Sequence, residues 1–166
     1  MVKTQSIVPI FLLACAQACS AAWTTVEHQD TALPPIAYTE NIIGQRTEVS
    51  MGEDNAVQLR LLLGTGFETF AASSCPTFQI DDRVPLHHFE LGIRCEIDEK
   101  IATFHLGQIT DDEIDSLVLH RFMNGNIVMF RYTVNNGQYR RAQFSLRNSK
   151  KALKQTVGAD TRLLVD

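Results

Sequence analysis

Short runs in which apolar and polar residues alternate dominate the middle of the chain. The clearest is 57–61, Val-Gln-Leu-Arg-Leu, in which every second side chain is apolar. Because successive side chains of a strand point to opposite faces, this pattern predicts a strand with one buried face and one wet face. Apolar runs bounded by turn residues predict short strands over 45–49, 57–63, 67–72, 76–80, 85–89, 92–97 and 101–106.

Two longer runs near the C-terminus predict a hairpin. Residues 126–134 and 138–146 are rich in β-branched and aromatic residues and flank Asn135-Asn136-Gly137. A glycine at the last position of such a turn supplies the positive φ that the connection requires. We therefore expect these two segments to pair as antiparallel strands.

The pattern changes to a helical period between these groups of strands. Thr110 and Glu113 have the spacing of a capping box, which predicts a helix over 111–123. Asn124-Gly125 is typical of a left-handed helix end. The apolar residues expected on the buried side of this helix are Ile114, Leu117, Val118 and Phe122.

A second short helix is predicted over 149–157, begun by Asn148 or Ser149 and ended by Gly158. The sum of these elements predicts a β-rich α+β fold, in which two antiparallel sheets form a sandwich-like domain with two short helices. We place this single domain at 41–158. Residues 23–40, interrupted by two prolines, are expected to form an extended N-terminal arm, and 159–166 a tail that is partly ordered at best.

The first twenty-two residues have the composition of a secretory signal peptide. Lys3 is the only charged residue before Glu27, and 7–18 are almost all apolar or small. The small residues 20–22 favour cleavage between Ala22 and Trp23. Residues 16–18 have a similar pattern and provide a second possible cleavage site, before Cys19. The alternative is lipidation of Cys15 in a lipobox-like Leu-Leu-Ala-Cys motif. Either route predicts an exported protein, periplasmic or lipid-anchored to the envelope.

The cysteine positions agree with export. Two of the four cysteines lie in the leader, and the other two are Cys75 and Cys95. Pairs of cysteines in an oxidising compartment usually form disulfides, so we expect a bridge that closes a loop of about 20 residues. No Cys-x-x-Cys spacing favours a metal site or a redox pair instead.

Charge narrows the class of partner. The formal net charge of the 166 residues is −4, which excludes a global basic field for nucleic acid or anionic lipid. Cationic residues do gather near the C-terminus, and they are either ordinary solvated charges or a basic patch that meets an acidic protein partner. The candidate patch consists of Arg140, Arg141, Lys150, Lys151 and Lys154.

Candidate catalytic or metal-binding residues are sparse. His87 and His88 are adjacent, so on a strand they would point to opposite faces and could not easily share one metal. His105 and His120 supply no spacing that places two ligands on one face. Asp81 and Asp82 fit turn chemistry better than an acid pair. We predict no catalytic residues, no metal and no cofactor.

Several segments of the C-terminal half resemble a known family of envelope proteins. The resemblance lies in 78–82 (Phe-Gln-Ile-Asp-Asp), 122–125 (Phe-Met-Asn-Gly), 127–131, 142–146 and 149–153. Their order is similar to that in small periplasmic proteins of the invasion-associated locus B type. It also resembles that in accessory proteins of type VI secretion clusters. The resemblance implies a β-sandwich-like envelope protein without catalytic residues.

These observations together predict a non-enzymatic bacterial envelope protein that binds another protein, as an accessory of a secretion or surface machine. An immunity protein or enzyme inhibitor in the periplasm is the first alternative. A small-ligand or glycan binder, with a deep pocket around His87, His88 and Asp82, is the second. The only membrane contact expected is an N-terminal lipid.

Overall fold

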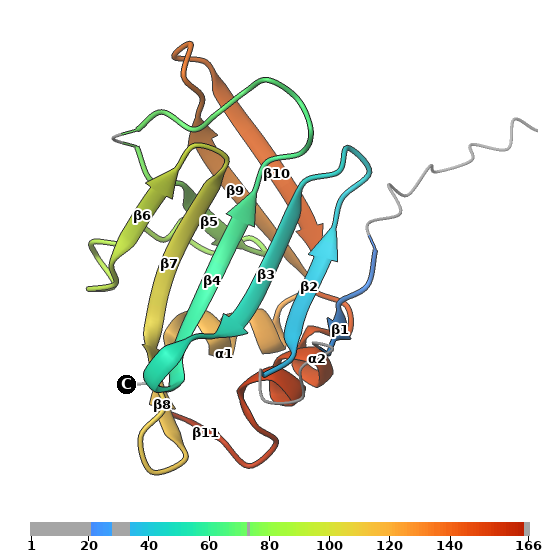
Figure 1. The fold of residues 1–166 in the computed structure, drawn as a ribbon, viewed down its shortest axis with the longest axis vertical. Helices are drawn as coiled ribbons and strands as arrows, with labels where there is room; N and C mark the ends of the chain where they lie inside the picture. Colours follow the sequence, from blue (N-terminus) through green and yellow to red (C-terminus); the bar gives the residue numbers. More distant parts are fainter. Residues whose placement is uncertain (1–20, 28–33, 73, 165–166) are drawn as a thin grey trace, which may run out of the picture.

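The computed structural model describes residues 21–27, 34–72 and 74–164, and two antiparallel sheets pack face to face in it (Figure 1). The larger sheet has the order β1-β2-β3-β4-β7-β6. Its strands are β1 (Thr24–Val26), β2 (Ile36–Glu40), β3 (Arg46–Met51), β4 (Ala56–Leu62), β7 (Ile101–Gln108) and β6 (Cys95–Asp98). A single 3-10 turn (η1, Glu53–Asn55) joins β3 to β4.

The smaller sheet has the order β10-β9-β5, with β10 (Tyr139–Ser145), β9 (Ile127–Thr133) and β5 (Thr77–Ile80). Two helices, α1 (Leu117–Asn124) and α2 (Ser149–Val157), lie together at one end of the sandwich (Figure 1). A short parallel pair, β8 (Glu113–Asp115) and β11 (Arg162–Leu164), completes the described chain. The predicted β-rich α+β sandwich is thus confirmed. Neither described helix has the length and apolar character that crossing a membrane requires.

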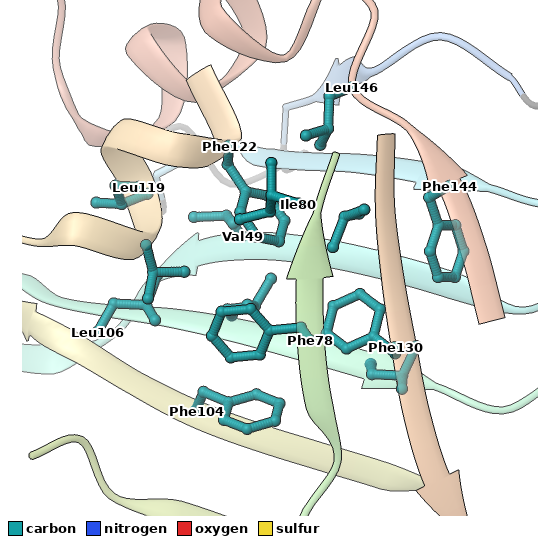
Figure 2. Close-up of a cluster of buried hydrophobic side chains, with 14 of the residues drawn as sticks. Val49, Phe78, Ile80, Phe104, Leu106, Leu119, Phe122, Phe130, Phe144 and Leu146 are labelled. Atoms are coloured by element: carbon teal, nitrogen blue, oxygen red, sulfur yellow. The ribbon is translucent and has the colours of Figure 1, made fainter. Parts of the chain in front are cut away.

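Aromatic rings from both sheets fill the space between them (Figure 2). Phe78 of β5 is fully buried and makes an edge-on contact with Phe104 of the larger sheet, with ring centroids 5.6 Å apart. It also contacts Phe130 of β9 at 6.0 Å and Phe122 of α1 at 6.4 Å. Edge-on geometry is the favoured arrangement of such rings, and their burial supplies much of the hydrophobic stabilisation.

The alternation of the sequence explains which residues reach this core. In β4, the buried positions are every second residue, as predicted from the run that begins at Val57. The hairpin is also confirmed, because β9 and β10 pair along seven residues. Gly137 adopts φ 82° in the turn, and its N–H donates to the carbonyl of Val134 at 2.8 Å. By contrast, the strands expected over 67–72 and 85–89 are reduced to single bridges, Phe70 with Val134 and Leu86 with Phe78.

The N-terminal end of the described chain is more ordered than expected. Within the predicted arm, β2 pairs with β3 along four residues, and Trp23 is only 3% exposed. The Trp23 indole N–H donates to the carbonyl of Ser145 at 2.9 Å. Within the predicted tail, β11 pairs in parallel with β8. Pairing and burial against distant segments correct the expectation of a loose arm, whereas a strand over 162–164 is compatible with a tail that is ordered in part; 1–20, 28–33 and 165–166 lie outside the described residues.

The first helix begins six residues later than its predicted start at 111. Thr110 and Glu113 exchange two backbone hydrogen bonds of 2.9 Å across a tight turn instead of forming a capping box. Asp111 and Asp112 occupy that turn with φ of 51° and 60°, a conformation that aspartate tolerates better than most residues. The true N-cap is Ser116, whose hydroxyl accepts from the Leu119 N–H at 3.3 Å.

The predicted disulfide joins the two sheets. Cys95 is the first residue of β6, an edge strand of the larger sheet, and Cys75 lies two residues before β5, an edge strand of the smaller sheet. Because the bridge connects the edges on one side of the sandwich, it restrains how far the sheets can separate there.

Candidate functional site

The structure divides the predicted basic patch. Arg140 lies at the start of β10 and forms a forked ion pair with Glu68, with N–O distances of 2.6 and 3.2 Å. The hydrogen bond to Glu68 raises the pKa of Arg140. Arg141 points to the opposite side of the same strand, where it lies opposite Arg131 of β9. These two arginines therefore do not form one surface.

The three lysines of the predicted patch lie together on α2. Lys150, Lys151 and Lys154 are all exposed, and Lys151 and Lys154 border a hollow of about 450 Å³ beside Thr25. Arg141 is separated from these lysines along the chain. It lies four residues, or about 13 Å at the usual rise of a strand, before the end of β10, and α2 begins only after this strand has ended. The lysines are consequently a separate cationic group at the helical end of the molecule.

The histidines and aspartates considered for catalysis have structural neighbours. The His88 ring nitrogen Nδ1 lies 3.2 Å from the carbonyl of Ile93, and the His87 ring packs against Phe89. The Asp81 carboxylate accepts hydrogen bonds from the backbone N–H groups of Asn126 and Ile127, each at 3.0 Å. No group of three or more His, Cys, Asp or Glu side chains suited to a metal occurs within the described part of the chain.

A row of polar and charged residues crosses the outer face of the larger sheet. The register places Tyr38, Glu48, Arg60, Thr103 and Glu96 side by side on β2, β3, β4, β7 and β6. No described helix or strand lies over this face, which is turned to the viewer in Figure 1. We call it the sheet face and define it by Tyr38, Arg46, Glu48, Arg60, Glu96 and His105.

Glu48 organises one half of the sheet face. Its side chain is only 6% exposed, and its two oxygens lie 3.0 Å from Nε of Arg46 and 2.7 Å from Nη2 of Arg60. The Arg46 guanidinium also stacks on the Tyr38 ring, 3.8 Å from its centroid. Because the carboxylate is nearly buried and doubly paired, it holds both arginines in place more firmly than an exposed ion pair could.

A second, more exposed cluster continues the face on β6 and β7. Glu96 pairs with Nε of Arg94 at 2.9 Å and lies 3.7 Å from Nε2 of His105. The Arg94 and Glu96 side chains are 70% and 56% exposed, so solvent screens this pair. The sheet face could not be predicted from the sequence, because charges at alternate positions show only that one side of a strand is exposed to solvent. Which solvent-exposed residues lie side by side depends on the register of five strands.

Four connections meet at the end of the sandwich opposite the helices. We call them the loop end: 41–45, 63–72, 99–100 and 134–138 (Figure 1). Backbone hydrogen bonds join the last three, from Leu63 to Lys100 at 2.9 Å and from Asn135 to Thr69 at 3.0 Å, and Ile43 of the first borders the same hollow as Gly64 of the second. The loops therefore behave as one surface rather than as independent turns.

A polar network lies beneath the loop end. The Gln45 amide donates to the Tyr132 hydroxyl at 2.6 Å, and both residues are buried. Burial raises the pKa of the Tyr132 phenol, and the hydrogen bond from Gln45 partly opposes this effect. A hollow of about 230 Å³ opens above them, with Glu68, Ile43 and Gly64 among its walls.

Comparison with known proteins agrees with the fold. No protein-family model matches the chain, and no curated protein matches its sequence. The crystal structure of invasion associated protein B from Bartonella henselae is similar, with a TM-score of 0.57 and 12% sequence identity. The match covers 84% of this chain and 94% of that one. At this identity the likeness concerns the fold, and it agrees with the loose resemblance to the invasion-associated locus B type, while the resemblance to type VI secretion accessory proteins stays a prediction.

Proposed function

We propose that this chain is an exported envelope protein that acts by binding another protein through its sheet face, without catalysis of its own. The proposed setting is a secretion or surface machine, in which the protein is an accessory. Export is supported by the leader-like pattern of 1–22 and by the Cys75–Cys95 bridge, because such bridges persist mainly in oxidising compartments.

The observation that carries the proposal is the nearly buried Glu48 between Arg46 and Arg60 on an uncovered sheet. Each guanidinium has five N–H donors, and one carboxylate cannot use all of those that two arginines offer. The Arg46 and Arg60 side chains are 31% and 30% exposed, so part of each reaches solvent from the strands. Arginine and tyrosine are also the residue types most often found at the energetic centres of protein interfaces. The expected partner presents carboxylates and backbone carbonyls to this face.

The test compares two triple variants in the exporting host. In the first, Arg46→Gln, Glu48→Gln and Arg60→Gln remove the charges together, so that no unpaired charge is left buried. In the second, Lys150→Gln, Lys151→Gln and Lys154→Gln neutralise the exposed lysines of α2. A photoreactive residue in place of Thr103, at the centre of the sheet face, captures the partner in both backgrounds.

We expect one discrete adduct with the photoreactive group in place of Thr103. The affinity of the protein for its partner should fall about tenfold or more in the sheet-face variant, as for the loss of interface hot spots. The same affinity should be unchanged in the α2 variant. Thermal unfolding of both proteins serves as the folding control. The opposite order of effects would contradict the proposal and place the partner on the lysines. Mass spectrometry of the adduct distinguishes a machine component from an enzyme that this protein inhibits.

A further inference from the structure

Three large apolar side chains project into solvent from the loop end. Ile42 and Ile43 are 76% and 66% exposed, and Phe67 is fully exposed at 103%. They come from two loops that touch, since a Cβ placed on Gly64 would lie 3.1 Å from the Ile43 carbonyl oxygen. Clustered apolar exposure of this kind marks a surface that meets another apolar phase.

The backbone around these side chains is held in place. The Asn41 carboxamide oxygen accepts from the N–H groups of Ile43 and Gln45, at 3.2 and 3.0 Å. On the second loop, the Lys100 ammonium donates to the carbonyl of Gly66 at 2.5 Å, and Glu68 is held by Arg140. The residues on both sides of Phe67 are thus fixed, and its ring is presented outward rather than folded back onto the domain.

The point where the chain enters the fold lies next to this surface. The Ala21 N–H donates to the carbonyl of Glu40 at 3.3 Å, and the Thr39 hydroxyl donates to the carbonyl of Ala21 at 2.7 Å. Glu40 is the last residue of β2 and leads directly into 41–45. The apolar run over 7–18 and the candidate lipidation site at Cys15 therefore lie a few residues upstream of the loop end. When Cys15 carries the lipid, the six residues from Cys15 to Ala21 reach about 20 Å at most, so the membrane would lie at this end of the domain.

We propose that the loop end docks on the surface of a phospholipid bilayer, with Ile42, Ile43 and Phe67 entering the headgroup region. This orients the domain with its loops towards the membrane and leaves the sheet face free for a protein partner. The neighbouring cations are already engaged, Arg140 by Glu68 and Lys100 by Gly66, so the contact depends on apolar area rather than on charge. Binding should consequently need no anionic lipid and should persist at high salt.

The test is flotation with phosphatidylcholine vesicles. The protein is exported from a bacterial host with Cys15→Ser, which prevents attachment of an acyl chain, and intact mass confirms that the leader has been removed, so that any flotation comes from the folded domain. We expect the protein to float with the vesicles at both low and high salt. The variant Ile42→Ser, Ile43→Ser, Phe67→Ser should lose about tenfold or more in vesicle partitioning.

Val84→Ser with Phe89→Ser is the matched control, because these side chains are 79% and 68% exposed on the connection between β5 and β6. This variant should float like the parent protein. Phe67→Ser alone guards against misfolding, since a fully exposed ring has no packing to lose. Absence of flotation by the parent protein would overturn the proposal, as would equal losses in the control. Concentration-dependent dimerisation abolished by Phe67→Ser would also overturn it, because a second copy would then occupy the surface.

Discussion

Gly125 shows how a single residue can have a different role from the one its type suggests. An Asn-Gly pair after a helix predicts a left-handed end, but Gly125 is extended, with φ −93° and ψ 176°. What it supplies is space. A Cβ at this position would lie 2.5 Å from Cγ2 of the buried Ile80 and 2.9 Å from the carbonyl oxygen of Arg121. The glycine therefore allows α1 to pack closely on the smaller sheet.

Substitution Gly125→Ala should destabilise the protein by about 1–3 kcal/mol, the usual cost of overpacking a core. The mechanism is displacement of Ile80 or of the last turn of α1. Urea unfolding measures the change. Gly66→Ala is the control, because a Cβ at Gly66 meets nothing within 4 Å. Equal stability of Gly125→Ala and the parent protein would show that the contact relaxes without cost.

At the scale of elements, α1 shows how tertiary pairing overrides a helix signal. The two aspartates after Thr110 are good first-turn residues, yet they form a left-handed turn. The reason lies in the next residues, since β8 pairs with β11 and the Ile114 side chain is buried in the core. A helix that began at 111 would lose both the pairing of β8 with β11 and the burial of Ile114. The helix begins only after Ser116, where the strand has ended.

The two candidate N-caps can be separated by substitution. Ser116→Ala should cost about 1 kcal/mol, because the Leu119 N–H then loses its acceptor. Thr110→Ala should change the free energy of unfolding by about 0.5 kcal/mol or less, as for other exposed positions. Thermal or urea unfolding distinguishes them. A larger effect at Thr110 would support the helix start expected from the sequence.

At the scale of the whole molecule, the two sheets are joined along both open sides. On one side the disulfide links the segment before β5 to β6. On the other side Trp23, just before β1, donates hydrogen bonds from its backbone and its indole to the carbonyls of Arg147 and Ser145, each at 2.9 Å. Its ring also packs edge-on against Phe122, 6.1 Å away. The sandwich is thus fixed at both sides, which keeps the loop end and the sheet face rigid.

Removing the bridge by Cys75→Ser with Cys95→Ser should lower the free energy of unfolding by about 3 kcal/mol, the value expected for a loop of this length. The unfolded chain gains conformational freedom when the bridge is lost. Urea unfolding of the double variant and of the reduced parent protein should give the same midpoint. A midpoint equal to that of the oxidised protein would show that packing alone holds these two edges.

Local patterns in the sequence were sufficient for part of this structure. The alternation in β4, the glycine turn of the hairpin, the extent of α2 and the pairing of the two cysteines after the leader depend on neighbouring residues or on simple chemistry. The same patterns correctly indicated a β-rich sandwich. Leader cleavage and lipidation of Cys15 remain predictions, because nothing in the structure tests processing of the chain and Cys15 lies outside the described residues.

Tertiary structure alone decided the rest. Burial of Trp23, pairing of β11 with β8 and the approach of Arg140 to Glu68 each join residues that are far apart in the chain. The sheet face arises from the register of five strands, and the loop end from four turns that meet in space. Alternation of apolar and polar residues reveals which side of a strand is exposed to solvent, but not which strand lies beside it. That choice depends on packing of the whole core, so the surfaces proposed for binding could be located only in the folded molecule.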